Sequence, residues 1–70
     1  MTENVYKIVE LVGTSEESVS KAIDRAISKA SLTLRHLGWF EVIQVRGHIE
    51  NGKVAHYQVT IKAGFRLEDE

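Results

Sequence analysis

Apolar and polar residues alternate in three successive patterns along the chain, and each pattern predicts one type of element. Residues 5–12 are mostly β-branched or aromatic, with Lys7 and Glu10 between them, which predicts a strand that ends at Gly13. Residues 39–50 and 54–67 predict two further strands. Between the first and second strands, apolar residues recur at spacings of three and four, which predicts one amphipathic helix that ends at Gly38. These residues are Val19, Ala22, Ile23, Ala26, Ile27, Ala30, Leu34 and Leu37.

The predicted start of the helix is a capping box at Thr14-Ser15-Glu16-Glu17. In such a box the Thr14 hydroxyl accepts from the amide of Glu17, and the Glu17 carboxylate accepts from the amide of Thr14. Glu16 and Glu17 then lie in the first turn, where the helix dipole favours negative charge. The helix is therefore expected to follow directly from the first strand.

Asn51-Gly52 is the strongest short-range signal for a two-residue type I′ hairpin turn. If these two residues are the whole loop, the numbers of paired residues sum to 103. Trp39 then faces Gly64, and Val45 faces Gln58. The prediction is a single domain over residues 1–70 of the α+β class, with β-α-β-β order and a three-stranded antiparallel sheet packed on one long helix.

This register sorts the side chains of the two long strands onto two faces. The helix is expected to cover Phe40, Val42, Tyr57, Val59, Ile61 and Ala63. The other face is too apolar for water and too polar for a core, which is typical of a surface buried against another subunit. It comprises Trp39, Glu41, Ile43, Val45, Gly47 and Ile49 with His56, Gln58, Thr60 and Lys62. In this register, Arg46 and His48 fall on the helix-covered face, unless a bulge near Gly47 shifts them. Without such a bulge, His48 and His56 are expected on opposite faces, where they cannot share a metal ion within one chain.

Size and composition argue against several classes of protein, including disulfide-stabilised, metal-binding and membrane proteins. A domain of 70 residues buries a small core with little net stability, and without cysteine it can form neither disulfides nor thiolate metal sites, so oligomerisation is expected. Three scattered histidines predict no metal site. The net charge of −1 argues against a general polyanion binder. There is neither a signal-peptide pattern nor an apolar run of membrane-spanning length, so we expect a cytoplasmic protein without a membrane partner. No nucleophile has histidine and acid at a recognisable spacing, so no catalytic residue and no enzyme activity are predicted.

Several stretches together resemble the dodecins, small flavin-binding proteins that assemble into hollow dodecamers. The resemblance covers nearly all of the chain. It rests on Val5-Tyr6-Lys7, Glu10-Leu11-Val12-Gly13-Thr14-Ser15, Thr33-Leu34-Arg35-His36-Leu37-Gly38-Trp39-Phe40-Glu41-Val42, Arg46-Gly47, Tyr57-Gln58-Val59 and Gly64-Phe65-Arg66-Leu67. His48 and Ala63 depart from the family pattern.

The resemblance implies roles for four residues in flavin binding. Trp39 matches the tryptophan that stacks on the isoalloxazine ring, with two flavins and two tryptophans piled across a two-fold axis. Gln58 matches a glutamine whose amide pairs with the polar edge of the ring. Arg46 and Arg66 match arginines beside the flavin phosphate. Flavin mononucleotide (FMN) is the implied ligand, with riboflavin and flavin adenine dinucleotide (FAD) as alternatives, and storage or sequestration with photoprotective quenching as the implied function.

The resemblance also suggests a second nucleotide on the helix. Lys29, Thr33 and Arg35 match a region that is linked in some bacterial dodecins to coenzyme A, whose phosphates suit these cations and this hydroxyl.

The register supports assembly separately from the resemblance. Gln58 lies six residues along its strand from Gly64, the partner of Trp39. At about 3.3 Å per residue this is roughly 20 Å, more than a flavin ring spans. If both residues touch one flavin, they must come from different subunits, so the pocket is expected only in the oligomer.

Two other functions remain open at this point. The Trp39 face could stack the bases of single-stranded nucleic acid, although it offers few cations. Alternatively, Trp39 could be the anchor of a purely structural oligomer.

Overall fold

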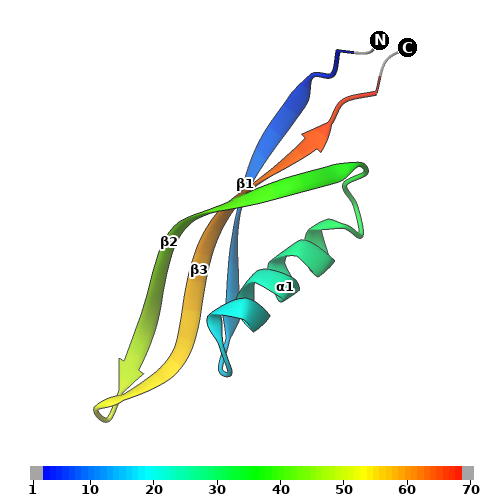
Figure 1. Cartoon of the computed structure of the whole chain (residues 1–70). Helices are drawn as coiled ribbons and strands as arrows, with labels where there is room; N and C mark the ends of the chain where they lie inside the picture. The colour runs from blue at the N-terminus through cyan, green and yellow to red at the C-terminus, as the bar shows by residue number, and fades with distance from the viewer. Residues whose placement is uncertain (1–2, 69–70) are drawn as a thin grey trace.

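The computed structural model describes residues 3–68, which form the elements β1 (Tyr6–Ser15), α1 (Val19–Ala30), β2 (Leu37–Glu50) and β3 (Lys53–Arg66). The strands make one antiparallel sheet in the order β1-β3-β2, so β3 is central. Figure 1 shows α1 along one face of the sheet and the β2–β3 hairpin extending past the start of the helix. The predicted β-α-β-β order and the antiparallel sheet are confirmed.

The helix begins later than predicted, because β1 continues through Thr14 to Ser15 and pairs there with β3. Ser18 is the N-cap, and its hydroxyl accepts from the amide of Lys21 at 3.0 Å. The Ser15 hydroxyl accepts from the amide of Glu17 at 2.9 Å. The predicted capping box at Thr14 is therefore wrong, and Glu17 and the residue before it lie ahead of the first turn.

The helix also ends earlier than predicted, at Ala30. Leu34 and Leu37 continue the apolar spacing but lie in the connection to β2 and at the first residue of that strand. The left-handed residue of this connection is His36, with φ 64°, and Gly38 already belongs to β2. Within residues 3–68, therefore, no helix has the length and apolar character to cross a membrane.

Gly13 does not end the first strand but allows the helix to approach it. A Cβ atom on Gly13 would overlap the carbonyl group of Ala22 on α1. The missing side chain brings the buried alanines of α1, Ala22 and Ala26, onto β3, where Val59 and Ile61 complete the core.

This core is small for a chain of this length. Val59 and Ile61 are the only large side chains that are fully buried within residues 3–68. The solvent-accessible surface is 5471 Å², against about 4,400 Å² for a monomeric protein of this mass. The radius of gyration is 14.6 Å, against about 11 Å for a compact domain of this length. The chain is therefore too extended to be a self-contained globule.

Strand β2 accounts for much of the exposed apolar surface. α1 packs against β1 and β3, and every residue of β2 after Leu37 is exposed. Phe40 and Val42 share a face with the buried residues of β3, yet they are 48% and 41% exposed. The prediction that the helix covers them is wrong, because a 12-residue helix seated on β1 and β3 does not reach the edge strand.

The hairpin turn is as predicted, but the register of β2 on β3 changes along its length. Asn51 and Gly52 both have positive φ, and Glu50 pairs with Lys53 as expected for a type I′ turn. Trp39 pairs with Gly64, also as predicted. Between these points, β-bulges shift the pairing by one residue, with Ala55 as the extra residue of β3 and Ile43 as the extra residue of β2.

The bulges correct five face assignments. One of them is Ile49, which was predicted on the face turned away from α1 but lies on the helix side, where it lines a cavity with Val45 and Tyr57. Arg46 pairs with Gln58 and His48 with His56, so both lie on the face turned away from α1. Val45 and Gly47 pair with Val59 and Tyr57 and lie on the helix side, opposite to the prediction. The predicted pairing of Val45 with Gln58 is wrong for the same reason. The second bulge, at Ile43, restores the predicted register, so Trp39 to Val42 keep their predicted faces.

Candidate ligand-binding face

The face of the sheet turned away from α1, here called the open face, carries the predicted flavin-binding residues. Antiparallel pairing arranges its side chains in rows across the three strands. From one end to the other, the rows in the order β1, β3, β2 are Ile8–Gly64–Trp39, Glu10–Lys62–Glu41, Val12–Thr60–Gln44 and Thr14–Gln58–Arg46, and beyond the end of β1 the pair His56–His48.

At one end of the open face, the Trp39 indole lies directly over Gly64. A Cβ atom on Gly64 would overlap both rings of the indole, so only glycine fits beneath it. Tyr6 flanks the indole with ring centroids 6.5 Å apart and planes tilted by 50°. Trp39 nevertheless remains 43% exposed. The backbone and one neighbouring ring thus hold the indole in place while part of its surface is left for an aromatic ligand.

At the other end of the open face, Arg46 lies beside Gln58, and Thr14 flanks Gln58 on the far side. Directly opposite residues in a sheet have Cβ atoms about 4.5–5.5 Å apart, so a single ligand can reach both side chains. Arg46 makes no salt bridge within residues 3–68, as its absence from all four ion pairs shows. This end therefore combines an amide that both donates and accepts with a free guanidinium group.

The two ends of the open face are too far apart to contact one ring within a single chain. Trp39 pairs with Gly64, and Gln58 lies six residues further along β3. The rise of about 3.3 Å per residue separates the two rows by roughly 20 Å. Each chain therefore carries a predicted stacking half-site, Trp39, at one end and a predicted polar half-site, Gln58 with Arg46, at the other.

Arg66 lies at the Trp39 end and is not close to Arg46. It pairs in register with Tyr6, and its Nη2 donates to Nδ1 of His36 at 3.4 Å. The Nε2–H of His36 donates to Glu68 Oε2 at 2.6 Å. This hydrogen bond, together with the positive charge of Arg35, lowers the pKa of the Glu68 carboxyl. Any phosphate that reached Arg66 would have to share it with this network.

The three residues predicted to bind coenzyme A lie on two different elements. Lys29 is in the last turn of α1, whereas Thr33 and Arg35 lie in the connection to β2 and not on the helix as predicted. Thr33 and Arg35 line a cavity of about 240 Å³ together with Glu68, and Arg35 Nη2 is 3.6 Å from Glu68 Oε2. A carboxylate thus already partners Arg35, and coenzyme A binding stays a prediction.

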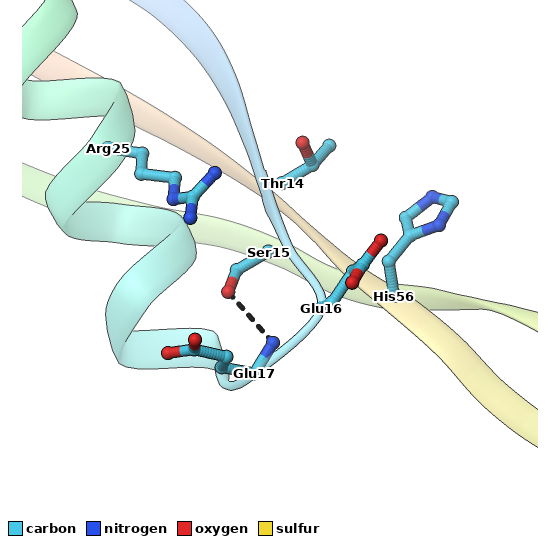
Figure 2. Close-up of a pocket in the computed structure, with 6 residues that line it drawn as sticks. All are labelled: Thr14, Ser15, Glu16, Glu17, Arg25 and His56. Carbon is cyan, nitrogen blue, oxygen red and sulfur yellow. Dashed lines mark hydrogen bonds between the residues drawn. The ribbon is translucent and has the colours of Figure 1, made fainter.

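A further cavity is lined by none of the four predicted flavin residues, although its lining residue Thr14 pairs with Gln58. It has a volume of about 430 Å³ and sits where β1 turns into α1 (Figure 2). Its lining is polar and carries both signs of charge, so it matches neither a flavin ring nor a free phosphate. The lining residues are Thr14, Ser15, Glu16, Glu17, Arg25 and His56.

The comparisons with known proteins agree with this architecture. The family model described as Dodecin matches residues 5–68. The dodecin of Thermus thermophilus is 57% identical over 65 residues, which are 93% of this chain and 94% of that protein. The chain belongs to the dodecin family. The structure of dodecin from Streptomyces coelicolor has a TM-score of 0.93 and 54% identity and covers 100% of both chains. Dodecin from Streptomyces davaonensis gives a TM-score of 0.93 at 48% identity, over 97% of this chain and 100% of that chain.

The dodecins are small flavin-binding proteins, so flavins are the class of ligand to consider for this chain. Sequence reasoning identified Trp39, Gln58 and Arg46 in this dodecin chain, but not their neighbours Tyr6 and Thr14. It also missed the pairing of His48 with His56, because the bulge that creates it involves Ala55, an ordinary strand residue.

Replacing Gly64 with alanine should displace the Trp39 indole, because the new methyl group would occupy its space. We expect Gly64→Ala to change the near-ultraviolet circular dichroism and the emission maximum of Trp39, the only tryptophan. Overpacking of this kind costs about 1–3 kcal/mol. Gly38→Ala is the matched control, since a Cβ atom there meets Tyr6 at an ordinary 3.7 Å. Unchanged tryptophan spectra in Gly64→Ala would show that the indole does not rest on Gly64.

Proposed function

We propose that this dodecin is a cytoplasmic flavin-storage protein that binds FMN between subunits of a homododecamer. Each flavin is held by Trp39 from one subunit and by Gln58 and Arg46 from another. The observation that carries the proposal is the separation of these residues into two half-sites at opposite ends of the open face. Neither half-site alone offers both a stacking surface and polar groups for the edge of the ring.

The exposed surface of β2 supports the assembled state in this proposal. β2 is an edge strand of 14 residues with apolar side chains on both faces. Such an edge exposed to water is an aggregation hazard, so natural proteins pair or cover it. Packing of neighbouring subunits on β2 covers this surface and brings a stacking half-site against a polar one.

Arg46 supports the preference for FMN. It has no salt bridge within the described chain, and it lies beside Gln58, so it can reach a phosphate on the ligand whose ring edge Gln58 binds. Arg66 is less suited to this role, because His36 already accepts a hydrogen bond from it. FAD and riboflavin share the same ring, but riboflavin lacks the phosphate that Arg46 would bind.

The open face favours binding over the two other functions that the sequence left open. Lys62, its central cation, lies between Glu10 and Glu41 in one row, so the face lacks the positive potential that binds nucleic acid. A purely structural role for Trp39 gives no use to the other end of the open face, where Arg46 lies beside Gln58 and makes no salt bridge within residues 3–68. Tryptophan stacked on the ring would also block substrate access, which favours storage with quenching of the excited flavin over redox catalysis.

Trp39→Ala should remove most of the flavin affinity while leaving the assembly intact. Stacking on an aromatic side chain is worth about 1–3 kcal/mol, so the dissociation constant should rise roughly 5- to 150-fold. Titration of free flavin by fluorescence quenching measures this, and size-exclusion chromatography with light scattering checks the assembly. Trp39→Phe keeps a smaller aromatic ring, so its flavin affinity should lie between those of the wild-type protein and Trp39→Ala. If Trp39→Ala quenches flavin at wild-type concentrations, Trp39 is not the stacking residue.

Arg46→Ala should narrow the difference in affinity between FMN and riboflavin. An arginine–phosphate bond contributes about 1.5–3 kcal/mol, so we expect wild-type protein to bind FMN roughly ten- to a hundred-fold more tightly at low salt. The margin should decrease as salt rises, because a partly exposed ion pair is screened. Arg25→Ala, which removes the same charge at the cavity of Figure 2, is the control and should preserve the margin. Wild-type protein that prefers riboflavin at low salt would disprove phosphate recognition by Arg46.

A further inference from the structure

Two histidines form a cross-strand pair near the tip of the β2–β3 hairpin, in the row of the open face next to Arg46 and Gln58. His48 of β2 pairs in register with His56 of β3, and their ring centroids are 5.3 Å apart with planes 22° from parallel. The side chain of His48 is 54% exposed. The pair lies just beyond the end of β1, whose last residue, Ser15, pairs with Tyr57. The hairpin carries both rings, and His56 also lines the cavity where β1 turns into α1.

A β-bulge creates this pair. The type I′ turn alone would place His48 opposite Ala55, because Glu50 pairs with Lys53 and Ile49 with Val54. The structure instead leaves Ala55 as the extra residue of β3, and the shift of one residue brings the two histidines opposite each other. Bulges characteristically redirect side chains, often beside functional sites.

We propose that His48 and His56 bind a divalent transition-metal ion of the zinc, nickel and copper group. Imidazole nitrogen is a preferred ligand for these ions, with a metal–nitrogen distance of about 2.0–2.1 Å for zinc. Two imidazoles at a tetrahedral angle on one such ion have ring centroids about 5 Å apart. The separation of 5.3 Å in the chain already meets this requirement.

The rings need only to rotate, because stacked rings do not aim their in-plane lone pairs at one point. The Cβ–Cγ torsion of histidine is broad, and exposed side chains change rotamer within picoseconds to nanoseconds. The backbone of the two strands, which sets the spacing of the rings, does not have to move. A site whose spacing is fixed by a sheet loses little conformational entropy on binding.

Oxygen-bearing side chains close to the two histidines decide how many further ligands the chain could supply to the metal ion. Glu50 Oε2 is 3.8 Å from Nε2 of His48, close enough to become a ligand after a small movement. On the other side, Glu16 and Thr14 line the same cavity as His56 (Figure 2). Within residues 3–68 no three His, Asp or Glu side chains are already gathered as a metal cage. The ion would therefore keep water ligands, and two nitrogen donors select against calcium and magnesium, which prefer oxygen.

Zinc titration by calorimetry on the assembled full-length protein tests this site. We expect wild-type protein to bind one Zn²⁺ per chain at this pair, and both His48→Gln and His56→Gln to weaken that binding. Loss of a partner that only orients a metal ligand costs roughly 10- to 100-fold in affinity, and loss of a direct ligand should cost at least as much. His36→Gln is the control and should leave the affinity unchanged, because His36 lies on the connection between α1 and β2.

A second readout identifies the ligands directly. Electron paramagnetic resonance of bound Cu²⁺ should show coupling to two imidazole nitrogens in wild-type protein and to one in either variant of the pair. Zinc affinity that is lost in His36→Gln but kept in His48→Gln and His56→Gln would overturn the proposal. So would a copper spectrum without coupling to imidazole nitrogen.

Discussion

The extent of the sheet that α1 can cover is the constraint on which the rest of this structure depends. A helix of 12 residues packs on β1 and β3 and leaves the 14 residues of β2 without cover on either face. The resulting core has two fully buried large side chains, Val59 and Ile61. At about 25 cal/mol per Å² of buried apolar surface, so small a core offsets little of the conformational entropy that is lost when residues 3–68 become ordered. The surface that the helix leaves open must therefore stabilise the protein through contacts with other copies.

The same open surface explains why the ligand-binding groups can be divided between the two ends of one strand pair. Trp39 is held over Gly64 at one end, and Arg46 and Gln58 lie together at the other. In the proposed assembly, burial of β2 against neighbouring subunits brings unlike ends of the open face into contact. On this account the flavin pocket and the stability of the subunit have one physical origin, and a variant that weakens assembly also weakens flavin binding.

The sequence predicted the parts of the fold that depend on strong local signals. Asn51-Gly52 specified the turn, and counting outward from it placed Trp39 correctly on Gly64. The helix boundaries were less well predicted, because Thr14 fits a capping box as well as Ser18 fits a simple cap. The choice between them depends on the pairing of Ser15 with Tyr57, a contact between distant residues. Leu34 and Leu37 continue the helical spacing of apolar residues beyond Ala30, so the spacing alone predicted a longer helix than the structure has.

The bulges were the main feature that sequence could not locate. Ala55 and Ile43 are ordinary strand residues, and nothing in their chemistry marks them as the unpaired ones. The strand has a period of two, so each missed bulge reverses the face of every residue up to the next. For that reason the prediction placed Arg46 on the wrong face and kept the two hairpin histidines apart. The family resemblance suggested a role for Arg46 on the ligand-binding face, where strand parity did not place it.

The most direct test of the central claim, that each flavin pocket takes its two half-sites from different subunits, is complementation in mixed assemblies. Trp39→Ala and Gln58→Ala chains each lack one half-site, and each should bind flavin poorly alone. Co-expressed in equal amounts, they should regain tight flavin binding at roughly a quarter of the pockets, because random mixing leaves that share with both half-sites intact. Titration of flavin with the mixed assemblies, followed by the quenching of flavin fluorescence, gives the fraction of pockets that bind flavin tightly. Mixed assemblies that bind no more flavin than the two variants separately would mean that Trp39 and Gln58 do not act on one flavin from different chains.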